Sequence, residues 1–159
     1  MLIAVLTVSD RCSQGRATDT AGPAVVALLR EQWPTATIHT ALVPDEEARI
    51  ATYLEQQSER SVSLILTVGG TGLGPRDRTP EATLRVLDRQ APGFSEAMRS
   101  KGSESNPNAW LSRGVAGLRG STLIVNLPGS LSGAQESLSA ILPLLCHALE
   151  VASGSQRHP

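Results

Sequence analysis

The chain has 159 residues and a formal net charge of −1, and 40% of its residues are hydrophobic. This length and composition are typical of one globular domain with its own core. The near-neutral charge argues against a nucleic-acid-binding protein, because a phosphate backbone favours a clear basic excess. No apolar run approaches the ~20 residues that cross a bilayer, so we expect no membrane segment.

The two cysteines, Cys12 and Cys146, are too few for a disulfide framework, and their spacing fits no zinc motif. The apolar start of the chain is short and has neither a basic lead nor a cleavage site, so we interpret it as a strand rather than a signal peptide. These features together predict a cytoplasmic protein.

The first part of the chain alternates apolar runs with helical patterns. Residues 2–8 form a continuous apolar run, which is typical of a central strand covered on both faces. The polar residues 9–19 are predicted to form a loop. Apolar side chains at helical spacing predict a helix over residues 20–32, and residues 37–43 are predicted to form a second strand.

The second predicted strand ends at Pro44. Asp45 then stands where a helix N-cap would stand, ahead of a helix predicted over residues 46–59. Residues 62–68 form a third apolar run, and we expect a buried strand there. Thr79 followed by a proline predicts the N-cap and first turn of a further helix.

That further helix is predicted to end at Val86, and another to cover residues 93–101. Residues 102–110 are polar and are predicted to form a loop or a broken helix. Short β-like runs at 115–118 and 122–127 predict a hairpin.

The last helix is predicted from apolar residues at positions i, i+3, i+4, i+7 and i+11. They are Leu138, Ile141, Leu142, Leu145 and Leu149. Pro143 inside this helix is expected to bend it or to remove a backbone hydrogen bond. Strands alternating with helices, without a repeat or linker, predict one layered α/β domain.

A glycine-rich segment follows the third strand. Such a turn places backbone N–H groups at the carboxyl end of a sheet, where open α/β sheets bind ligands and helix starts favour phosphate. A phosphate loop of the GxxxxGKS type is excluded because the segment has no lysine. The dinucleotide fingerprint GxGxxG is also excluded, because Gly70, Gly72 and Gly74 are spaced as GxGxG. An anion site and a simple tight connection both remain compatible with this segment.

Acidic residues follow each of the first three strands. They are Asp10, Asp45 and Asp77, and Ser9 precedes the first. If the strands are parallel neighbours, these carboxylates converge on one edge of the sheet. There they could hold a magnesium ion beside a bound phosphate. Helix capping for Asp45 and a turn contact for Asp77 are the alternatives.

Two later segments are candidates for a second pocket. Asn126-Leu127-Pro128-Gly129-Ser130 follows the last strand, and it forms either a capped turn or a pocket in which Asn126 and Ser130 contact an anion or a heterocycle. Ser112 and Arg113 offer a hydroxyl and a guanidinium fork suited to phosphate. A surface arginine is the alternative for Arg113.

Seven short blocks occur in one order over nearly the whole chain. They are Ser9-Asp10-Arg11 with Gly15, Val43-Pro44-Asp45, Gly69-Gly70-Thr71-Gly72, Arg76-Asp77-Arg78-Thr79-Pro80-Glu81-Ala82, Pro92-Gly93-Phe94, Leu111-Ser112-Arg113 and Asn126-Leu127-Pro128-Gly129. In this combination the chain resembles the MogA/MoaB family of molybdopterin adenylyltransferases, whose domain also forms the N-terminal domain of gephyrin.

The resemblance implies a three-layer α/β/α fold with a mostly parallel sheet that contains at least one antiparallel strand. It implies a single molybdopterin-binding domain over residues 1–152 and a flexible tail over residues 153–159. It also implies a homotrimer.

In function, the resemblance implies molybdenum cofactor biosynthesis. ATP would adenylylate molybdopterin with Mg²⁺ and release pyrophosphate, and the product would pass to a metal-insertion protein. Asp45 and Asp77 would be the catalytic acids, and one or the other would hold Mg²⁺. The residues expected to bind the substrates are Ser9, Asp10, Gly69, Gly70, Thr71, Gly72, Arg76, Ser112, Arg113, Asn126, Pro128, Gly129 and Ser130.

The main alternative is a non-catalytic molybdopterin-binding or scaffold protein of the same pathway. A related domain also occurs in proteins that act on pyridine-nucleotide breakdown products. We favour that function less, because a second domain usually accompanies it. The sequence leaves open which pocket holds the pterin and which the adenine, and whether molybdenum or tungsten is inserted later.

Overall fold

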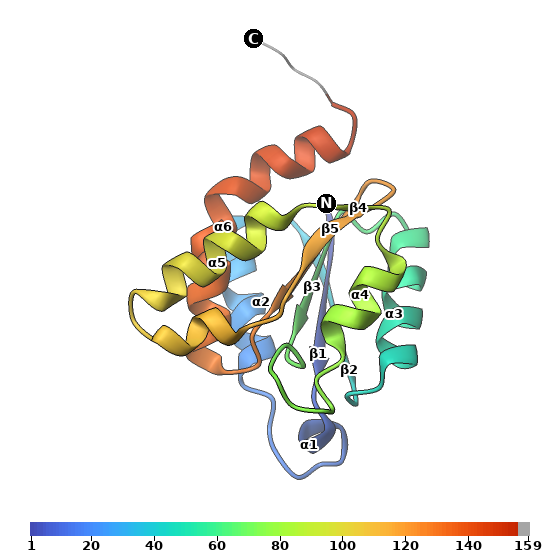
Figure 1. Cartoon of the computed structure of the whole chain (residues 1–159). Coiled ribbons are helices and arrows are strands. Elements are labelled where there is room, and N and C mark those ends of the chain that lie inside the picture. The colour runs from blue at the N-terminus through green and yellow to red at the C-terminus, as the bar shows by residue number, and fades with distance from the viewer. Residues whose placement is uncertain (156–159) are drawn as a thin grey trace.

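A six-stranded mixed sheet lies at the centre of the computed structural model, which describes residues 1–155 (Figure 1). The strands are β1 (Leu2–Val8), β2 (Thr37–Val43), β3 (Leu64–Val68), β4 (Arg89–Gln90), β5 (Ala116–Arg119) and β6 (Thr122–Leu127). Their order is β2-β1-β3-β6-β5-β4. The first four in this order are parallel, and the β6-β5 and β5-β4 pairs are antiparallel. The predicted mostly parallel sheet with an antiparallel strand is confirmed.

Helices cover both faces of this sheet. They are α1 (Asp10–Ser13), α2 (Ala21–Gln32), α3 (Glu47–Glu59), α4 (Thr79–Val86), α5 (Pro92–Ser103), the 3-10 helix η1 (Pro107–Leu111) and α6 (Leu131–Ala152). In Figure 1, α2, α5 and α6 lie on one side of the sheet, and α3 and α4 lie on the other. The predicted three layers are therefore confirmed. No helix within residues 1–155 is long and apolar enough to cross a membrane.

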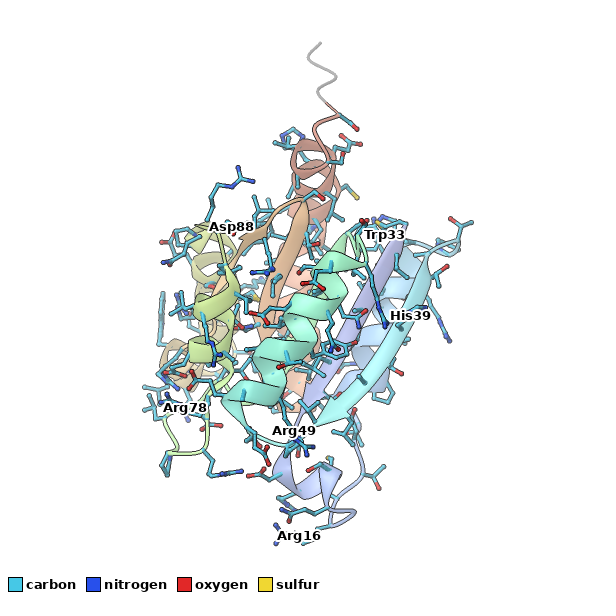
Figure 2. All side chains as sticks on the ribbon, turned by 90° about the vertical axis from the view of Figure 1, so that its right-hand side faces the viewer. Arg16, Trp33, His39, Arg49, Arg78 and Asp88 are labelled. Atoms are coloured by element: carbon cyan, nitrogen blue, oxygen red, sulfur yellow. The ribbon has the colours of Figure 1, made fainter. Side chains whose placement is uncertain are left out.

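Strand β1 shows why the central strands are apolar throughout. Ile3 and Val5 belong to the core beneath α2, α5 and α6, whereas Ala4 and Leu6 belong to the core beneath α3 and α4. Successive side chains of a strand point to opposite faces, so a strand covered on both sides has no solvent-facing position. At the edge of the sheet, β2 is more exposed, and His39 points outward (Figure 2).

The parallel strands end together at one edge of the sheet. Val8 of β1 pairs with Val43 of β2, Thr7 of β1 pairs with Val68 of β3, and Val68 pairs with Leu127 of β6. The loops that follow these four strands therefore meet, as expected if the strands were parallel neighbours.

Two predicted helix caps are wrong. The N-cap of α3 is Glu46, because the Asp45 carboxylate accepts the N–H of Asp10 from the neighbouring loop instead. Thr79 is the first residue of α4 rather than its cap, and its hydroxyl donates to the carbonyl of Gly69 at 2.9 Å. In both cases a partner distant in the sequence replaces the local one.

Several short elements escaped the sequence analysis. The predicted loop 9–19 contains α1, which Ser9 caps by accepting the N–H of Cys12. For residues 102–110 a loop or a broken helix was predicted, and the broken helix agrees with the structure, in which α5 ends at Ser103 and η1 begins at Pro107. Strand β4 was not predicted. Elements of two to five residues are too short to show a hydrophobic period.

Helix α6 is continuous through Pro143. It changes direction along its length (Figure 1), which agrees with the expected bend. The predicted tail begins after this helix, and residues 156–159 lie outside the described part of the chain.

Candidate functional site

Four loops from distant parts of the sequence meet at the carboxyl edge of the sheet. They are the start of α1 after β1, the Pro44-Asp45 turn after β2, residues 69–77 after β3 and residues 128–130 after β6. We call residues 69–77 the glycine loop. Open α/β sheets bind their ligands at such an edge.

The glycine loop begins with two residues that no other amino acid could replace without strain. Gly69 and Gly70 have φ angles of +109° and +67°. A Cβ on Gly69 would lie 2.3 Å from the carbonyl oxygen of Val8, and one on Gly70 would lie 2.3 Å from Oγ1 of Thr79. The glycines therefore let the loop pass directly over the end of β1 and against α4.

Asp10 and Asp45 join the first two loops through reciprocal hydrogen bonds. The N–H of Asp10 donates to Oδ2 of Asp45 at 2.8 Å, and the N–H of Asp45 donates to Oδ1 of Asp10 at 3.0 Å. Arg76 holds the Asp10 carboxylate in a two-pronged contact at 2.9 and 3.0 Å. Asp10 and Arg76, both predicted to bind substrate, are thus paired with each other.

The two carboxyls of this pair of loops have opposite electrostatic surroundings. The hydrogen bond from Arg76 lowers the pKa of Asp10. Burial raises the pKa of Asp45, and the charges of Asp10 and Asp77 raise it further. Asp45 forms no ion pair within residues 1–155, whereas Asp10 is paired with Arg76, so the negative charge of Asp45 is less compensated than that of Asp10.

Asp77 approaches the same place from the far end of the glycine loop. Its Oδ2 accepts the N–H of Gly74 at 2.8 Å. Asp45 and Asp77 both line a polar cavity of about 220 Å³. The rest of its wall is formed by Thr7, Val8, Ser9, Cys12, Thr18, Asp19, Thr20, Ala21, Val68, Gly69, Gly70 and Gly129. Two of the three predicted acids therefore face one space.

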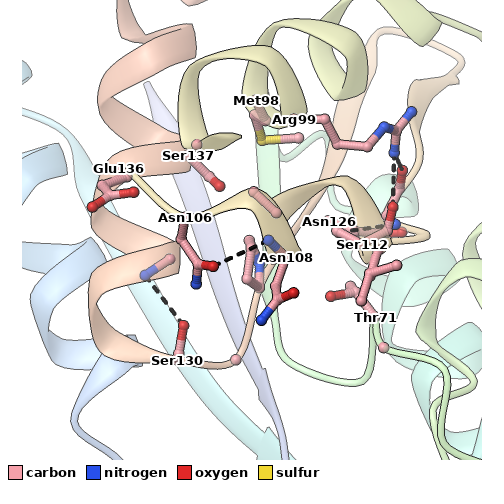
Figure 3. Close-up of a pocket in the computed structure, with 18 of the residues that line it drawn as sticks. Thr71, Met98, Arg99, Asn106, Asn108, Ser112, Asn126, Ser130, Glu136 and Ser137 are labelled. Atoms are coloured by element: carbon pink, nitrogen blue, oxygen red, sulfur yellow. Dashed lines mark hydrogen bonds between the residues drawn. The ribbon is translucent and has the colours of Figure 1, made fainter. Parts of the chain in front are cut away.

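A larger cavity, of about 390 Å³, adjoins the first. The two cavities share Gly70, Asp77 and Gly129. The wall of the larger one comes from the glycine loop, α5, η1, the segment after η1 and the start of α6 (Figure 3). It combines apolar groups with serine hydroxyls and asparagine amides, the mixture typical of small-molecule sites.

Comparisons with known proteins identify the family. The model of the family described as "Probable molybdopterin binding domain" matches residues 4–147. Molybdopterin adenylyltransferase of Escherichia coli (strain K12) is 42% identical over 146 residues, covering 87% of this chain and 72% of that protein. The chain belongs to the molybdopterin adenylyltransferase family.

Other relatives agree with this family assignment. Gephyrin of Dictyostelium discoideum is 40% identical over 158 residues and 93% of this chain, but the chain spans only 22% of the length of that protein. The crystal structure of the molybdopterin biosynthesis enzyme MoaB from Thermus thermophilus is 50% identical, with a TM-score of 0.87 over 96% of both chains.

In this member of the family, Arg113 is a clamp within the protein. Its guanidinium donates to the carbonyls of Gly72 and Asp77, each at 2.7 Å, and to the carboxylate of Glu81. The hydrogen bond from Arg113 lowers the pKa of Glu81. Arg76 therefore joins the glycine loop to α1, and Arg113 joins it to α4. Neither side chain lines either of the two cavities.

Asn126 is likewise held inside the protein. It is 1% exposed. Its amide nitrogen donates to the hydroxyls of Thr67 and Thr83 at 2.9 Å, and its Oδ1 accepts the N–H of Val115 at 3.1 Å. Ser130 accepts a hydrogen bond at the N-cap of α6. Asn126 and Ser130 nevertheless line the larger cavity, together with Thr71, Gly72, Ser112, Pro128 and Gly129.

One wall of the larger cavity was missed by the sequence analysis. Helix α5 lines it with Ser95, Met98, Arg99 and Gly102. Their spacing of i, i+3, i+4 and i+7 marks a single helix face. The face went unnoticed because polar residues interrupt it. Arg99 Nη1 also donates to two carbonyls of the segment after η1, those of Ser112 and Gly114.

The carboxylates of Asp45 and Asp77 are suited to bind a magnesium ion that is also bound to a phosphate group. No group of three or more His, Cys, Asp or Glu side chains within residues 1–155 is arranged to hold a metal alone. Asp45 and Asp77 each have one carboxylate oxygen that accepts no hydrogen bond from these residues. Mg²⁺ is usually held by one or two carboxylates together with substrate phosphates and waters. The donor set therefore matches a magnesium–phosphate group better than a resident metal.

Proposed function

We propose that this protein transfers the adenylyl group of ATP to the terminal phosphate of molybdopterin, with Mg²⁺, and releases pyrophosphate. The observation that carries the proposal is the pair of adjoining cavities that meet at Gly70, Asp77 and Gly129. A reaction that joins two substrates needs two binding places whose reacting ends touch. The name of the Escherichia coli relative, molybdopterin adenylyltransferase, supports the same reaction.

The chemistry needs no covalent intermediate with the protein. A phosphate oxygen of molybdopterin attacks the α-phosphorus of ATP, and a new P–O bond forms. The bond from the α-phosphorus to the bridging oxygen breaks, and pyrophosphate leaves with the electron pair. Both substrates are anions, so alignment and charge neutralisation provide most of the rate enhancement.

Asp45 and Asp77 are the residues that would hold Mg²⁺. When bound, Mg²⁺ supplies positive charge to the phosphate oxygens of the nucleotide. The raised pKa of Asp45, caused first by burial and then by the neighbouring carboxylates, shows that its surroundings disfavour negative charge. A cation at this place relieves that unfavourable field and keeps the carboxylate ionised.

The larger cavity offers a second source of positive potential. Gly129, Ser130, Ser132 and Gly133, at the start of α6, form part of its wall. The first N–H groups of a long helix favour anions, and α6 has 22 residues. We propose that phosphate groups lie between this helix start and the glycine loop.

The test is pyrophosphate release by the purified protein with ATP and Mg²⁺, with and without molybdopterin. We expect release to require molybdopterin. Asp77→Ala and Asp45→Ala should each lower it by at least about 100-fold, the typical effect of removing a group that stabilises the transition state.

Asp88→Ala is a matched control. Oδ2 of Asp88 accepts the N–H of Gly120, as Oδ2 of Asp77 accepts that of Gly74. Asp88 lies at the opposite end of the sheet from Arg78, the residue next to Asp77 (Figure 2). The control should retain full activity.

Two outcomes would contradict the proposal. One is full turnover by both variants, which would remove the roles given to Asp45 and Asp77. The other is tight binding of molybdopterin without release under any metal condition. That result would favour the non-catalytic binding or scaffold protein, whose cavities would be the same.

A further inference from the structure

Asp10 lies where three of the four loops at the carboxyl edge of the sheet come together. Its own loop follows β1. Its Oδ1 accepts the N–H of Asp45, from the turn after β2, and Nη2 of Arg76, from the glycine loop, each at 3.0 Å. Its Oδ2 accepts Nε of Arg76 at 2.9 Å. The Asp10 carboxylate is therefore bonded to both of the loops that carry the proposed metal ligands.

The Asp10 side chain does not line either of the two cavities of the candidate site. Both of its carboxylate oxygens accept hydrogen bonds from groups of the protein. Asp45, which is one hydrogen bond away, does line the smaller cavity. An effect of Asp10 on a bound ligand would therefore pass through Asp45 or through Arg76.

Asp45 is held by Asp10 at two points. Oδ1 of Asp10 accepts the main-chain N–H of Asp45, and the main-chain N–H of Asp10 donates to Oδ2 of Asp45. The other oxygen, Oδ1 of Asp45, accepts no hydrogen bond from residues 1–155 and is not a buried atom. A Cβ on Gly70 would lie 3.0 Å from this oxygen. The reciprocal bonds thus hold one free oxygen beside the glycine that both cavities share.

Asp10 also determines where the guanidinium of Arg76 lies. One oxygen, Oδ1 of Asp10, accepts both Nη2 of Arg76 and the N–H of Asp45, so the guanidinium lies close to Asp45 without forming an ion pair with it. The Arg76 side chain is 63% exposed, so it is free to turn if its partner is removed. A guanidinium bonded to Asp45 would occupy the oxygen that a metal needs, and its positive charge would repel the metal.

We propose that Asp10 is a positioning residue, which keeps Asp45 free to bind a metal by fixing its main chain and by holding Arg76 away from its free oxygen. The inference rests on the proposed function, in which Asp45 and Asp77 hold Mg²⁺. Groups that are hydrogen-bonded to metal-binding side chains orient them, and loss of such a group typically costs about 10- to 100-fold in metal affinity.

The experiment measures how strongly nucleotide binding depends on Mg²⁺, with the full chain and α,β-methylene-ATP as the probe. This analogue carries a carbon atom between its α- and β-phosphorus, so it binds without adenylyl transfer. Isothermal titration in Mg²⁺ and in EDTA gives two Kd values. In Asp10→Ala, the Kd in Mg²⁺ should rise about tenfold. The Kd in EDTA should stay the same or fall, because the variant has lost a negative charge near an anionic ligand.

Two further variants separate the two actions of Asp10. Asp10→Asn keeps an oxygen that can accept the N–H of Asp45 but loses the charge that pairs with Arg76. Its Kd in Mg²⁺ should therefore lie between those of the wild type and Asp10→Ala. Adding Arg76→Ala to Asp10→Ala should lower the Kd in Mg²⁺ again, because no guanidinium then competes with the metal. A double variant that binds no better than Asp10→Ala would overturn the part assigned to Arg76.

Glu47→Ala is the matched control. Oε2 of Glu47 accepts Nε and Nη2 of Arg78 at 3.1 and 2.7 Å. This ion pair also joins a segment after β2 to a segment after β3. Neither of its residues lines the two cavities. Both Kd values of Glu47→Ala should equal those of the wild type.

An unchanged Kd in Mg²⁺ for Asp10→Ala would overturn the inference. So would equal weakening in Mg²⁺ and in EDTA, which is the result expected of a residue that only supports the fold, or a wild type whose Kd does not depend on Mg²⁺. Absent pyrophosphate release by a wild type that still binds the analogue in an Mg²⁺- and Asp10-dependent way would contradict only the proposed function.

Discussion

Arg113→Ala removes the clamp between the glycine loop and α4. The side chain of Arg113 donates to the carbonyls of Gly72 and Asp77 and to the carboxylate of Glu81. Its backbone N–H donates to the carbonyl of Thr71 at 2.8 Å, and that bond remains in the variant. The substitution therefore tests the side-chain contacts alone.

We expect this variant to lose about 2–4 kcal/mol of unfolding free energy. A hydrogen bond that involves a charged group contributes about 1.5–3 kcal/mol. The side chains of Arg113 and Glu81 are 35% and 29% exposed, so solvent screens the pair and the three contacts do not add fully. For a chain of this size, the Tm should fall by roughly 4–16 °C.

The same clamp makes stability depend on pH. The hydrogen bond from Arg113 holds the pKa of Glu81 below its usual value of 4.5. A lowered folded-state pKa contributes stability that is present above the unfolded pKa and is lost as the pH falls through the folded pKa. The wild type should therefore lose stability below about pH 4.5, and Arg113→Ala should lose less over the same range.

Urea unfolding followed by circular dichroism at pH 7 and pH 4 measures both effects. Arg85→Ala is the control, because Arg85 is exposed in the last turn of α4 and forms no ion pair within residues 1–155. Arg113→Lys keeps the positive charge but loses the planar guanidinium group, so its loss of unfolding free energy should lie between those of the wild type and Arg113→Ala. Equal unfolding midpoints for the wild type and Arg113→Ala at pH 7 would refute the clamp.

Three further predictions concern the same edge of the sheet and the assembly. Asp45→Asn should unfold at an equal or higher urea concentration at pH 7, because the wild type loses stability as the pH rises through the raised pKa of this carboxyl. In thermal scans, Mg²⁺ should stabilise Asp45→Asn less than the wild type, and an equal shift would argue against Asp45 as a ligand. Gly69→Ala should lower the unfolding free energy by at least about 2 kcal/mol, whereas Gly93→Ala, whose Cβ would meet nothing within 4 Å, should cost much less in the same denaturation assay. Light scattering after gel filtration should give three times the chain mass of 16.7 kDa if the predicted trimer forms, and a monomer mass would contradict it.

The local pattern of the chain was sufficient for the main architecture. The apolar run of β1 predicted a strand buried on both faces, and Ile3 and Ala4 do belong to the two opposite cores. This inference depends on the alternation of side chains between the two faces of a strand, which a single segment displays by its own geometry. The strand ends also predicted that Asp10, Asp45 and Asp77 would converge, because parallel strands place their carboxyl ends together. Asp10 and Asp45 are hydrogen-bonded, and Asp45 and Asp77 line one cavity.

The partners of individual side chains depended on contacts between segments far apart in the sequence. Asp45 has the sequence position of a helix cap, but its carboxylate bonds to Asp10, 35 residues away. Arg113 has the composition of a phosphate fork, but its guanidinium bonds to groups 32 to 41 residues away. Ser95 has the sequence position of any serine in a helix, and only the structure shows that it lies beside a cavity and that its Oγ has no hydrogen-bond partner within residues 1–155. Local sequence specifies where helices and strands form, whereas the partner of a side chain is the group that the packed fold brings within about 3 Å.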